Sequence, residues 1–438
     1  MVRVTMSTKE QAGPDSALAS LEPDAHSGRL SAATRTSRFV LPHRVAFWVV
    51  ATAFLLNMAF SAVPTPLYVL YQQRDHFSAI MVTIVYAVYA VGVIASLFLV
   101  GHVSDWVGRR RILVMALLVN VASALLFIFI PSLIGLIAAR VVCGVAVGMT
   151  TATATAYLAE LHLSSRPGAS TKRPQVIAIA ANLGGIGFGP LLGGLLAQFA
   201  PAPLRLSYIV VGAALVVLAL VITSAPETVS ILDNPPAWRP QRVAVPSEGR
   251  RHFYAATFAG LAAFAVYGVF NSLVPSFLAG TLHETSHAVA GAVAFSAFAA
   301  GALAQIALGR LDTTQMLRRS VPILLAGLAL FTFGMWVPSL FIFILGGAVT
   351  GAGAGLVFRG GLVAAGSTAP LEARAEVMAG FLLGAYVGLS VPVIGLGIAT
   401  THVAAREAML VFVVLVAIAI VWSVRVVARF TSRSSEVH

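Results

Sequence analysis

Twelve apolar runs, each long enough to cross a lipid bilayer as a helix, constrain this chain more than any other feature. A helix of about 20 apolar residues spans a hydrocarbon core of ~30 Å. Only 10% of the 438 residues are charged, and these cluster in short segments between the runs. The composition therefore predicts an all-α membrane protein. Its predicted spans are 45–67, 78–100, 112–130, 133–159, 175–199, 206–224, 253–279, 288–308, 321–337, 340–365, 377–399 and 408–424.

The basic residues indicate how these spans are oriented, because Lys and Arg in short loops remain in the cytoplasm. With the amino terminus inside, nearly all of the 28 Lys and Arg residues fall in cytoplasmic loops and tails. The exceptions are Arg74, Arg205 and Arg406 in external loops and Arg140 and Arg359 within spans. We therefore expect both termini to be cytoplasmic. This bias also explains the net charge of +12, and no basic stripe is interleaved with aromatics, so nucleic acid is not an expected partner.

Two polar stretches divide the chain into domains. Residues 1–44 have no apolar core segment and are expected to form a disordered cytoplasmic tail. Residues 225–252, which contain "DNPPAWRP", form a predicted cytoplasmic linker between six-helix bundles at 45–224 and 253–424. A second cytoplasmic tail is expected at 425–438. The single cysteine, Cys143, excludes an intrachain disulfide.

The two predicted bundles resemble each other in order. "SAVPTPL" at 61–67 matches "SLVPSFL" at 272–278, and "RPQV" at 173–176 matches "RAEV" at 374–377. The glycine and proline matches are Pro190 and Gly193 with Pro392 and Gly395, and Gly144 and Gly148 with Gly351 and Gly355. These matches predict two pseudo-symmetric bundles. Such parallel repeats place a binding site near the midplane between them.

Several predicted spans carry polar residues, whereas the sixth and twelfth have apolar cores. Polar groups at membrane depth are tolerated when they face the interior of a bundle or a water-filled cavity. We expect these residues to contact a small-molecule substrate or a coupling ion. They are Asn57, Arg140, Thr150, Asn182, Asn271, Gln305, Arg359 and Tyr386.

The loop "GHVSDWVGRRR", residues 101–111, resembles the signature of the major facilitator superfamily. The matching residues are Gly101, Asp105, Gly108, Arg109, Arg110 and Arg111. Trp106 departs from the signature, because the family usually has a basic residue there. The resemblance covers all but the tails and implies two bundles that work by alternating access. It implies a monomeric transporter in a bacterial inner membrane and no cofactor.

The resemblance also implies that this loop is a conformational latch. Asp105 would bond the start of the eleventh span, and Arg109 would reach an acid at the end of the fourth span, where Glu160 lies in "AYLAEL". The alternative is that Arg109, Arg110 and Arg111 only anchor the topology.

The segment "GGIGFGPLLGG", residues 184–194, lies within a predicted span, which excludes the dinucleotide-binding fingerprint because no soluble strand precedes it. Small residues let helix backbones approach closely in lipid. The segment also resembles the span-5 signature of proton antiporters, although Val176 stands where that signature has another glycine. The resemblance implies a bend that seals the outer leak path; the alternative is a plain helix contact. The matching residues are Gly185, Gly189, Pro190, Gly193 and Gly194.

Charges within the spans bear on the substrate. "RVVCGVAVG", residues 140–148, resembles the fourth span of proton antiporters in Arg140 and Gly144, with Cys143 in place of a glutamine. None of the sixteen acids lies mid-span, so proton coupling follows from the resemblance alone, with His102 beside the latch as a titratable group. Two buried cations without acids favour anionic or neutral polar substrates, unless Arg359 reaches back to the cytoplasmic surface.

The segment "HETSH", residues 283–287, matches the zinc protease pattern, but it lies in a short external loop without a soluble domain to form a cleft. We therefore predict no metal site. No nucleophile and base converge in any segment, so we expect no enzyme.

The sequence therefore predicts a secondary active transporter in the lipid bilayer, with proton-coupled efflux of a small organic molecule as its function. An organic-anion importer or a substrate/substrate exchanger of the same fold is the alternative. A non-transporting membrane receptor is an alternative of another class, although neither the 44-residue tail nor the 28-residue linker provides a signalling domain.

Overall fold

The computed structural model describes residues 40–101, 103–230, 238–241, 243, 249–370 and 373–435, apart from the side chains of 375 and 430–435. Every regular element in these ranges is a helix. Within these described ranges, twelve helices, with broken ones counted as single spans, are long and apolar enough to cross a membrane, which confirms the predicted number.

The first half comprises ten elements, because two of its spans are interrupted and one short helix lies in a loop. The elements are α1 (His43–Ala62), α2 (Pro64–Asp75), α3 (Ala79–Val100), α4 (Ser104–Val107), α5 (Arg109–Phe129), α6 (Leu133–Ser165), α7 (Lys172–Ile179), the π-helix η1 (Ala180–Gly184), α8 (Gly185–Phe199) and α9 (Pro203–Ile222).

The last six spans comprise seven elements. They are α10 (Arg250–Ser272), α11 (Val274–Thr281), α12 (His287–Ala307), α13 (Thr313–Trp336), α14 (Leu340–Gly366), α15 (Arg374–Ala399) and α16 (Ala405–Ser435).

Proline interrupts the first span of each half at matching places. Pro64 begins α2 directly after Val63, and Pro275 lies in the first turn of α11 directly after the break at Leu273. Proline has no N–H to donate, and its ring clashes with the preceding turn of a helix. The two "VP" motifs of the repeat therefore produce the same break in each half.

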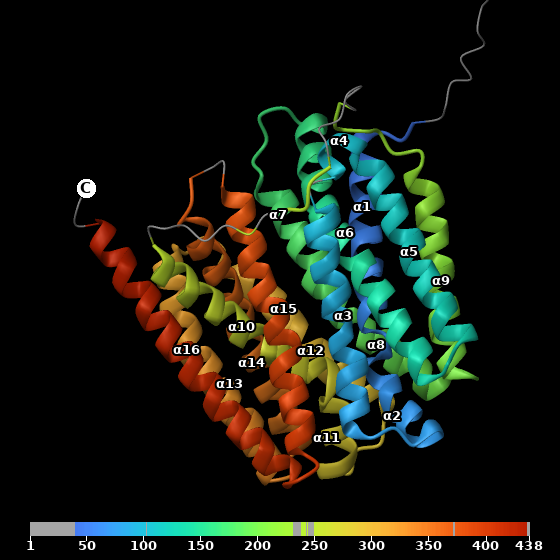
Figure 1. Cartoon of the computed structure of the whole chain (residues 1–438), viewed down its shortest axis with the longest axis vertical. Coiled ribbons are helices and arrows are strands. Elements are labelled where there is room, and N and C mark those ends of the chain that lie inside the picture. The colour runs from blue at the N-terminus through green and yellow to red at the C-terminus, as the bar shows by residue number, and fades with distance from the viewer. Residues whose placement is uncertain are drawn as a thin grey trace, which may run out of the picture. The chain divides into compact units, whose positions relative to one another are not determined.

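Each half is organised around its fourth helix. In the first half, α6 packs against α1, α3 and α5, and in the second half α14 packs against α10, α12 and α13. The halves meet mainly along two helix pairs, α3 with α15 and α8 with α12. Figure 1 shows the first half in blue to green and the second half in yellow to red, with these pairs between them.

The contacts between the halves gather at one end of the bundle. We call the end where α3 finishes and α5 starts the basic end, and the opposite end the far end. At the far end, the Thr65 hydroxyl donates to the Asn271 carbonyl at 2.9 Å, and the His287 amide donates to the Gln198 side chain at 3.1 Å. The outer part of α3 also packs on α15, where the Ser390 hydroxyl donates to the backbone of Ala87 at 3.1 Å.

The structure describes parts of the predicted tails and linker. The predicted tail at 1–44 lies outside the described residues as far as residue 39, and α1 begins at His43. The described linker segment at 238–241 crosses the end of α3, where the Trp238 indole donates to the Leu99 carbonyl at 2.9 Å. The predicted second tail, 425–438, is helical as far as Ser435 because α16 continues into it.

Candidate functional site: a charged cluster and a buried arginine

Arg109 is the centre of a charged cluster at the basic end. Its guanidinium lies 3.0 Å from Glu160 and 2.5 Å from Asp105, and it also donates to the Ser104 hydroxyl at 2.6 Å. The Arg109 side chain is 11% exposed, so it is the buried member of the cluster. The pairing with Glu160 is the contact that the loop resemblance implied. It ties the start of α5 to the end of α6.

Asp105 does not make the contact that the resemblance implied. Its carboxylate, which is 58% exposed, pairs with Arg109 one turn away and does not bond the start of α15. The latch role of Asp105 therefore stays a prediction for a different conformation.

Glu227 performs the helix-capping role that sequence reasoning gave to Asp105, but for α5. Its carboxylate accepts hydrogen bonds from the backbone amides of Arg109 at 2.8 Å and Arg110 at 3.2 Å. These amides have no partner within the helix, and a negative charge at a helix start is favourable. Thr228 next to it donates to Glu160 at 2.5 Å, which links Glu227 to the cluster.

Gly108 makes this arrangement possible. Its φ of +110° is strained for any residue with a side chain, and a Cβ there would lie 2.5 Å from the Glu227 carboxylate. Arg110 completes the contact by donating to the Ala225 carbonyl at 3.1 Å, beyond the end of α9. At Gly101, a Cβ would lie 3.1 Å from the side chain of Gln241 in the linker. At both signature glycines, therefore, a side chain from another segment lies close to the glycine backbone. His102 lies outside the described residues.

Asn57 belongs to a buried network that joins three helices of the first half. Its amide donates to the Thr150 hydroxyl at 2.7 Å, and its side-chain oxygen accepts from Asn120 at 2.8 Å. All three residues are completely buried. The side-chain oxygen of Asn120 has no partner, but the bonds that join the three side chains favour a role in fixing the packing of α1, α5 and α6 over contact with substrate. Asn120 was missed in the sequence because its neighbours form an ordinary apolar run.

Arg140 is buried without a carboxylate partner. It is 2% exposed, and its guanidinium lies 5.0 Å from the Tyr89 ring and 5.5 Å from the Tyr86 ring of α3. It donates to the Ser61 carbonyl at 2.5 Å, whereas its Nε atom has no partner. The hydroxyl of Tyr68, another member of this buried group, is also unpartnered. Aromatic faces therefore stabilise the cation, and two polar atoms remain available for hydrogen bonding.

The depths of the two span arginines differ. At about 1.5 Å per residue, Arg140 lies roughly 10 Å from the start of α6 at the far end, and Arg359 roughly 10 Å from the end of α14 at the basic end. Arg359 donates to the Gln305 carbonyl in the last turn of α12. A cation there offsets the negative end of the helix. The two arginines therefore do not converge on one site, and Arg359 has a local helix-capping contact.

The glycine-rich segment of α8 is a contact surface on both sides. A Cβ on Gly185, Gly189 or Gly193 would lie within 2.1–2.6 Å of a carbonyl oxygen of α1 or the break that follows it. A Cβ on Gly194 would lie 2.3 Å from the carbonyl of His287, the first residue of α12. Only glycine fits these four positions. The face toward α12 is contact between the two halves.

Pro190 lies within the same helix and does not end it. Its carbonyl faces Gly291 of α12, where a Cβ would come within 2.2 Å. A π-helical turn, η1, comes earlier in the same span. The bend implied by the resemblance stays a prediction.

Asn182 lies in that π-helix, which contacts both α1 and α12. Its half-buried side chain makes no hydrogen bond to any described residue. Just after it, no atom lies within 4 Å of the position that a Cβ on Gly184 would take. π-Helical turns occur often at functional sites. Asn182 is therefore a free amide at the junction of the halves.

The remaining predicted residues lie in the second half. Asn271 is buried at the junction and accepts from Thr65. Gln305 is buried, with its carbonyl bonded to Arg359. Tyr386 is half-buried in α15 and packs edge-on to Phe264 with ring centroids 5.5 Å apart. The structure thus brings the predicted polar residues into separate groups and not into one site.

The "HETSH" segment is not a helix with two histidines on one face. His283 has a left-handed backbone, with φ of 53°, and His287 is the first residue of α12. Glu284 accepts a hydrogen bond from the Ser286 amide at 2.9 Å. Within the residues that the structure describes, no group of three or more His, Cys, Asp or Glu side chains could hold a metal ion.

Comparison with known proteins agrees with this architecture. A family model described as Major Facilitator Superfamily matches residues 15–169, 50–255 and 256–437. No curated relative matches the chain. Among solved structures, a mutant of the nucleoside transporter NupG is similar, with a TM-score of 0.66 and 13% identity over 87% of this chain and 99% of that one.

A second solved structure has the same fold. It is a bacterial homolog of the human lysosomal transporter Spinster, in an inward-facing and unoccupied conformation, with a TM-score of 0.64 and 15% identity. The match covers 88% of this chain and 98% of that one. With the family model matched across both halves, the chain belongs to the Major Facilitator Superfamily and is a multi-pass membrane transporter.

Proposed function

We propose that this protein exports a small organic molecule in exchange for protons, with the basic end in the cytoplasm. The observation that carries the proposal is the glycine face of α8, which packs backbone to backbone on α1 and α12. An exchanger needs a path that never leaks, and close backbone packing leaves the least space for water or ions at the junction of the halves.

The charged cluster supports the same cycle. Arg109, Glu160 and Glu227 join α5, α6 and the segment after α9 into one unit at the basic end. Such a unit moves as a rigid body when the halves rock. Asp105, the exposed acid of the cluster, is then available to bond α15 when the basic end closes.

The substrate that we propose is anionic or neutral and polar. Arg140 has no carboxylate partner, and its Nε atom and the Tyr68 hydroxyl are both unpartnered. A substrate could supply the missing hydrogen-bond partners of these groups. It would not have to displace a carboxylate from Arg140, because none is bound there. Asn182 supplies a second hydrogen-bonding group, from the junction of the halves.

The test is transport in proteoliposomes with an imposed pH gradient. Labelled organic acids, sugars and lipophilic cations are screened, with Asp105→Asn as the impaired variant and Glu407→Gln as the matched control, because Glu407 is an acid in the first turn of α16 outside the cluster. Uphill accumulation that a protonophore abolishes, and that Asp105→Asn reduces while Glu407→Gln does not, supports the proposal. Accumulation of lipophilic cations alone would contradict the substrate class.

A second candidate function is organic-anion import or substrate/substrate exchange. The absence of a mid-span acid in the sequence favours it, because no carboxylate is placed to carry a proton within the membrane. Exchange of labelled for unlabelled anion that is equally fast with and without the pH gradient would favour this candidate and exclude proton coupling.

A further inference from the structure

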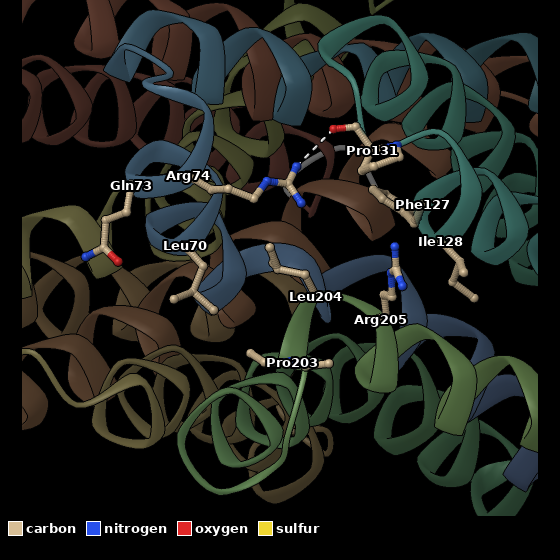
Figure 2. Close-up of a pocket in the computed structure, with 10 residues that line it drawn as sticks. Leu70, Gln73, Arg74, Phe127, Ile128, Pro131, Pro203, Leu204 and Arg205 are labelled. Atoms are coloured by element: carbon tan, nitrogen blue, oxygen red, sulfur yellow. Dashed lines mark hydrogen bonds between the residues drawn. The ribbon is translucent and has the colours of Figure 1, made fainter.

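A cavity of about 530 Å³ lies at the far end of the first half, away from the junction of the halves. It is formed by the end of α2, the end of α5, the turn at Pro131 and the start of α9. Figure 2 shows two arginines among its lining residues, Arg74 from α2 and Arg205 from α9. The transport cycle described above does not use this cavity.

The two arginines differ in their partners. Arg74 donates to both oxygens of Asp75, at 2.7 and 2.6 Å, and to the Pro131 carbonyl at 3.0 Å, so its guanidinium is held in place. Arg205 is exposed, and its side chain makes no hydrogen bond or ion pair with the described residues. The cavity therefore carries one positive charge more than its own acid balances.

This concentration of arginines is unexpected at this end of the molecule. Only three basic residues are expected in the loops of the far end, namely Arg74, Arg205 and Arg406, because Lys and Arg are otherwise confined to the basic end. Two of the three line the same cavity. Basic residues on this side are disfavoured by the topology rule. Because Asp75 balances Arg74, Arg205 is the charge that an anionic partner would balance.

The walls of the cavity indicate what else the partner contains. Leu70, Ile128 and Leu204 line it beside the arginines. Close in the chain to the lining residues Ile128 and Pro131, Phe129 is 74% exposed and Ile134 80% exposed, as expected for side chains that face lipid. The site thus offers a cation for an anionic group and an adjoining apolar surface for hydrocarbon. The amino-terminal end of α9 adds a favourable dipole for an anion.

We propose that this cavity binds the phosphate group of an anionic phospholipid in the leaflet at the far end, with Arg205 and Arg74 on the phosphate and an acyl chain along the apolar wall. Arginine forms paired hydrogen bonds with phosphate oxygens, and basic pockets between spans suit lipid headgroups. The lipid would hold the ends of α2, α5 and α9 together.

The proposal is tested by native mass spectrometry of the full-length protein, titrated with phosphatidylglycerol, phosphatidylcholine or glycerol 3-phosphate. The variant is Arg205→Gln, and the matched control is Arg406→Gln, because Arg406 lies over the Trp336 ring at 4.9 Å and outside the cavity. We expect one phosphatidylglycerol to bind wild type and Arg406→Gln alike, and about tenfold more weakly to Arg205→Gln. A thermal shift on adding phosphatidylglycerol should show the same order.

Three results would overturn the proposal. Equal phosphatidylglycerol binding by Arg205→Gln and Arg406→Gln would exclude the cavity as the site. Equal binding of phosphatidylcholine and phosphatidylglycerol would exclude the preference for an anionic lipid. Displacement of the lipid by glycerol 3-phosphate at equal concentration would identify a site for soluble phosphate esters instead. If Arg205→Gln unfolds, Arg205→Lys, which keeps the charge but loses the paired geometry, should bind two- to fivefold more weakly.

Discussion

The two halves of the molecule have the same arrangement of helices, but different kinds of side chain fill their interiors. By the repeat of α6 in α14, Arg140 corresponds to Gly347, and Tyr89 corresponds to Ala297 in α12. The backbone contacts are nevertheless alike, because a Cβ on Gly144 would lie 2.1 Å from the Tyr89 carbonyl. A Cβ on Gly351 would lie 2.0 Å from the Ala297 carbonyl in the same way.

Aromatic rings fill the space that the arginine occupies in the first half. A Cβ on Gly347 would contact the ring of Phe270 at 3.0 Å, and Phe270 packs on Phe331 with centroids 5.2 Å apart. Nearby, Tyr267 and Phe298 are stacked at 4.6 Å. The two halves therefore share the same backbone contacts here but differ in their side chains. The first half has a buried cation where the second half has aromatic rings.

The largest expected difference between the halves concerns their matching glycines. Gly193→Leu should abolish transport, because even a Cβ there would lie 2.4 Å from the Val63 carbonyl, and overpacking costs about 1–3 kcal/mol or more. Gly395→Leu should leave transport within about twofold, because no atom lies within 4 Å of its Cβ position. Transport and thermal unfolding of both variants are the measurements. Equal losses would show that the two faces are equivalent after all.

The capping of the third helix of each half gives the next largest difference. Glu227 caps α5 from a distant segment, whereas Asp312 caps its own helix, α13, by accepting from the Gln315 amide at 2.7 Å. Asp312→Ala should cost about 1 kcal/mol of stability and little transport. Glu227→Ala leaves two amides without their partner and should cost about 2–3 kcal/mol and reduce transport about tenfold.

Denaturant unfolding and transport rates of these two variants provide the check. A Glu227→Gln variant separates charge from hydrogen bonding, since it keeps one acceptor. Loss of stability without loss of transport in Glu227→Ala would show that the cluster stabilises the fold but takes no part in transport.

The span arginines should differ in kind. Arg140→Gln is expected to raise the KM for an anionic substrate about tenfold, which corresponds to about 1.4 kcal/mol of binding. Arg359→Gln should leave KM unchanged and lower stability by about 0.5–1 kcal/mol, because it removes a cation from the end of α12. Initial uptake rates across a range of substrate concentrations measure both. If Arg359→Gln and Arg140→Gln raised KM equally, both arginines would contribute to anion binding.

The smallest expected change in KM distinguishes two asparagines of the first half. Asn182→Ala should change stability by less than about 0.5 kcal/mol, because its amide has no bond to lose, while KM rises two- to fivefold. Asn57→Ala should cost about 1–3 kcal/mol, because Thr150 and Asn120 lose their partner, with KM unchanged. Thermal unfolding and substrate titration distinguish the two. The reverse pattern would place the substrate against Asn57.

The sequence predicts the spans well because membrane helices display their length and apolarity directly. It shows the two "VP" motifs as part of the repeat, but the helix breaks that they produce were not predicted. Glu227 was missed because it contacts Arg109 across 118 residues and resembles an ordinary linker acid. Its signal was an acid directly after the sixth span, on the same side of the membrane as Gly108.

The partners of Arg140 were missed for a different reason. Tyr86 and Tyr89 read as apolar side chains in a span, and an aromatic face is not recognisable as a cation partner until the helices are packed. The expected contact of Asp105 with the eleventh span depends on conformation. A single sequence encodes both states of a rocking protein, so it does not reveal which contacts coexist.

The π-helix at Ala180–Gly184 sets the rotational phase of one transmembrane span. A π turn adds one residue to the helix without adding a full α-helical step, and each α-helical residue turns the chain by about 100°. Straightening this turn into regular α-helix without removing a residue would rotate every position after it by about 100°. The glycines of α8 would then turn away from α1, and bulky neighbours would meet its carbonyls. The one extra residue in this turn therefore sets the angle at which the glycine face of α8 meets α1.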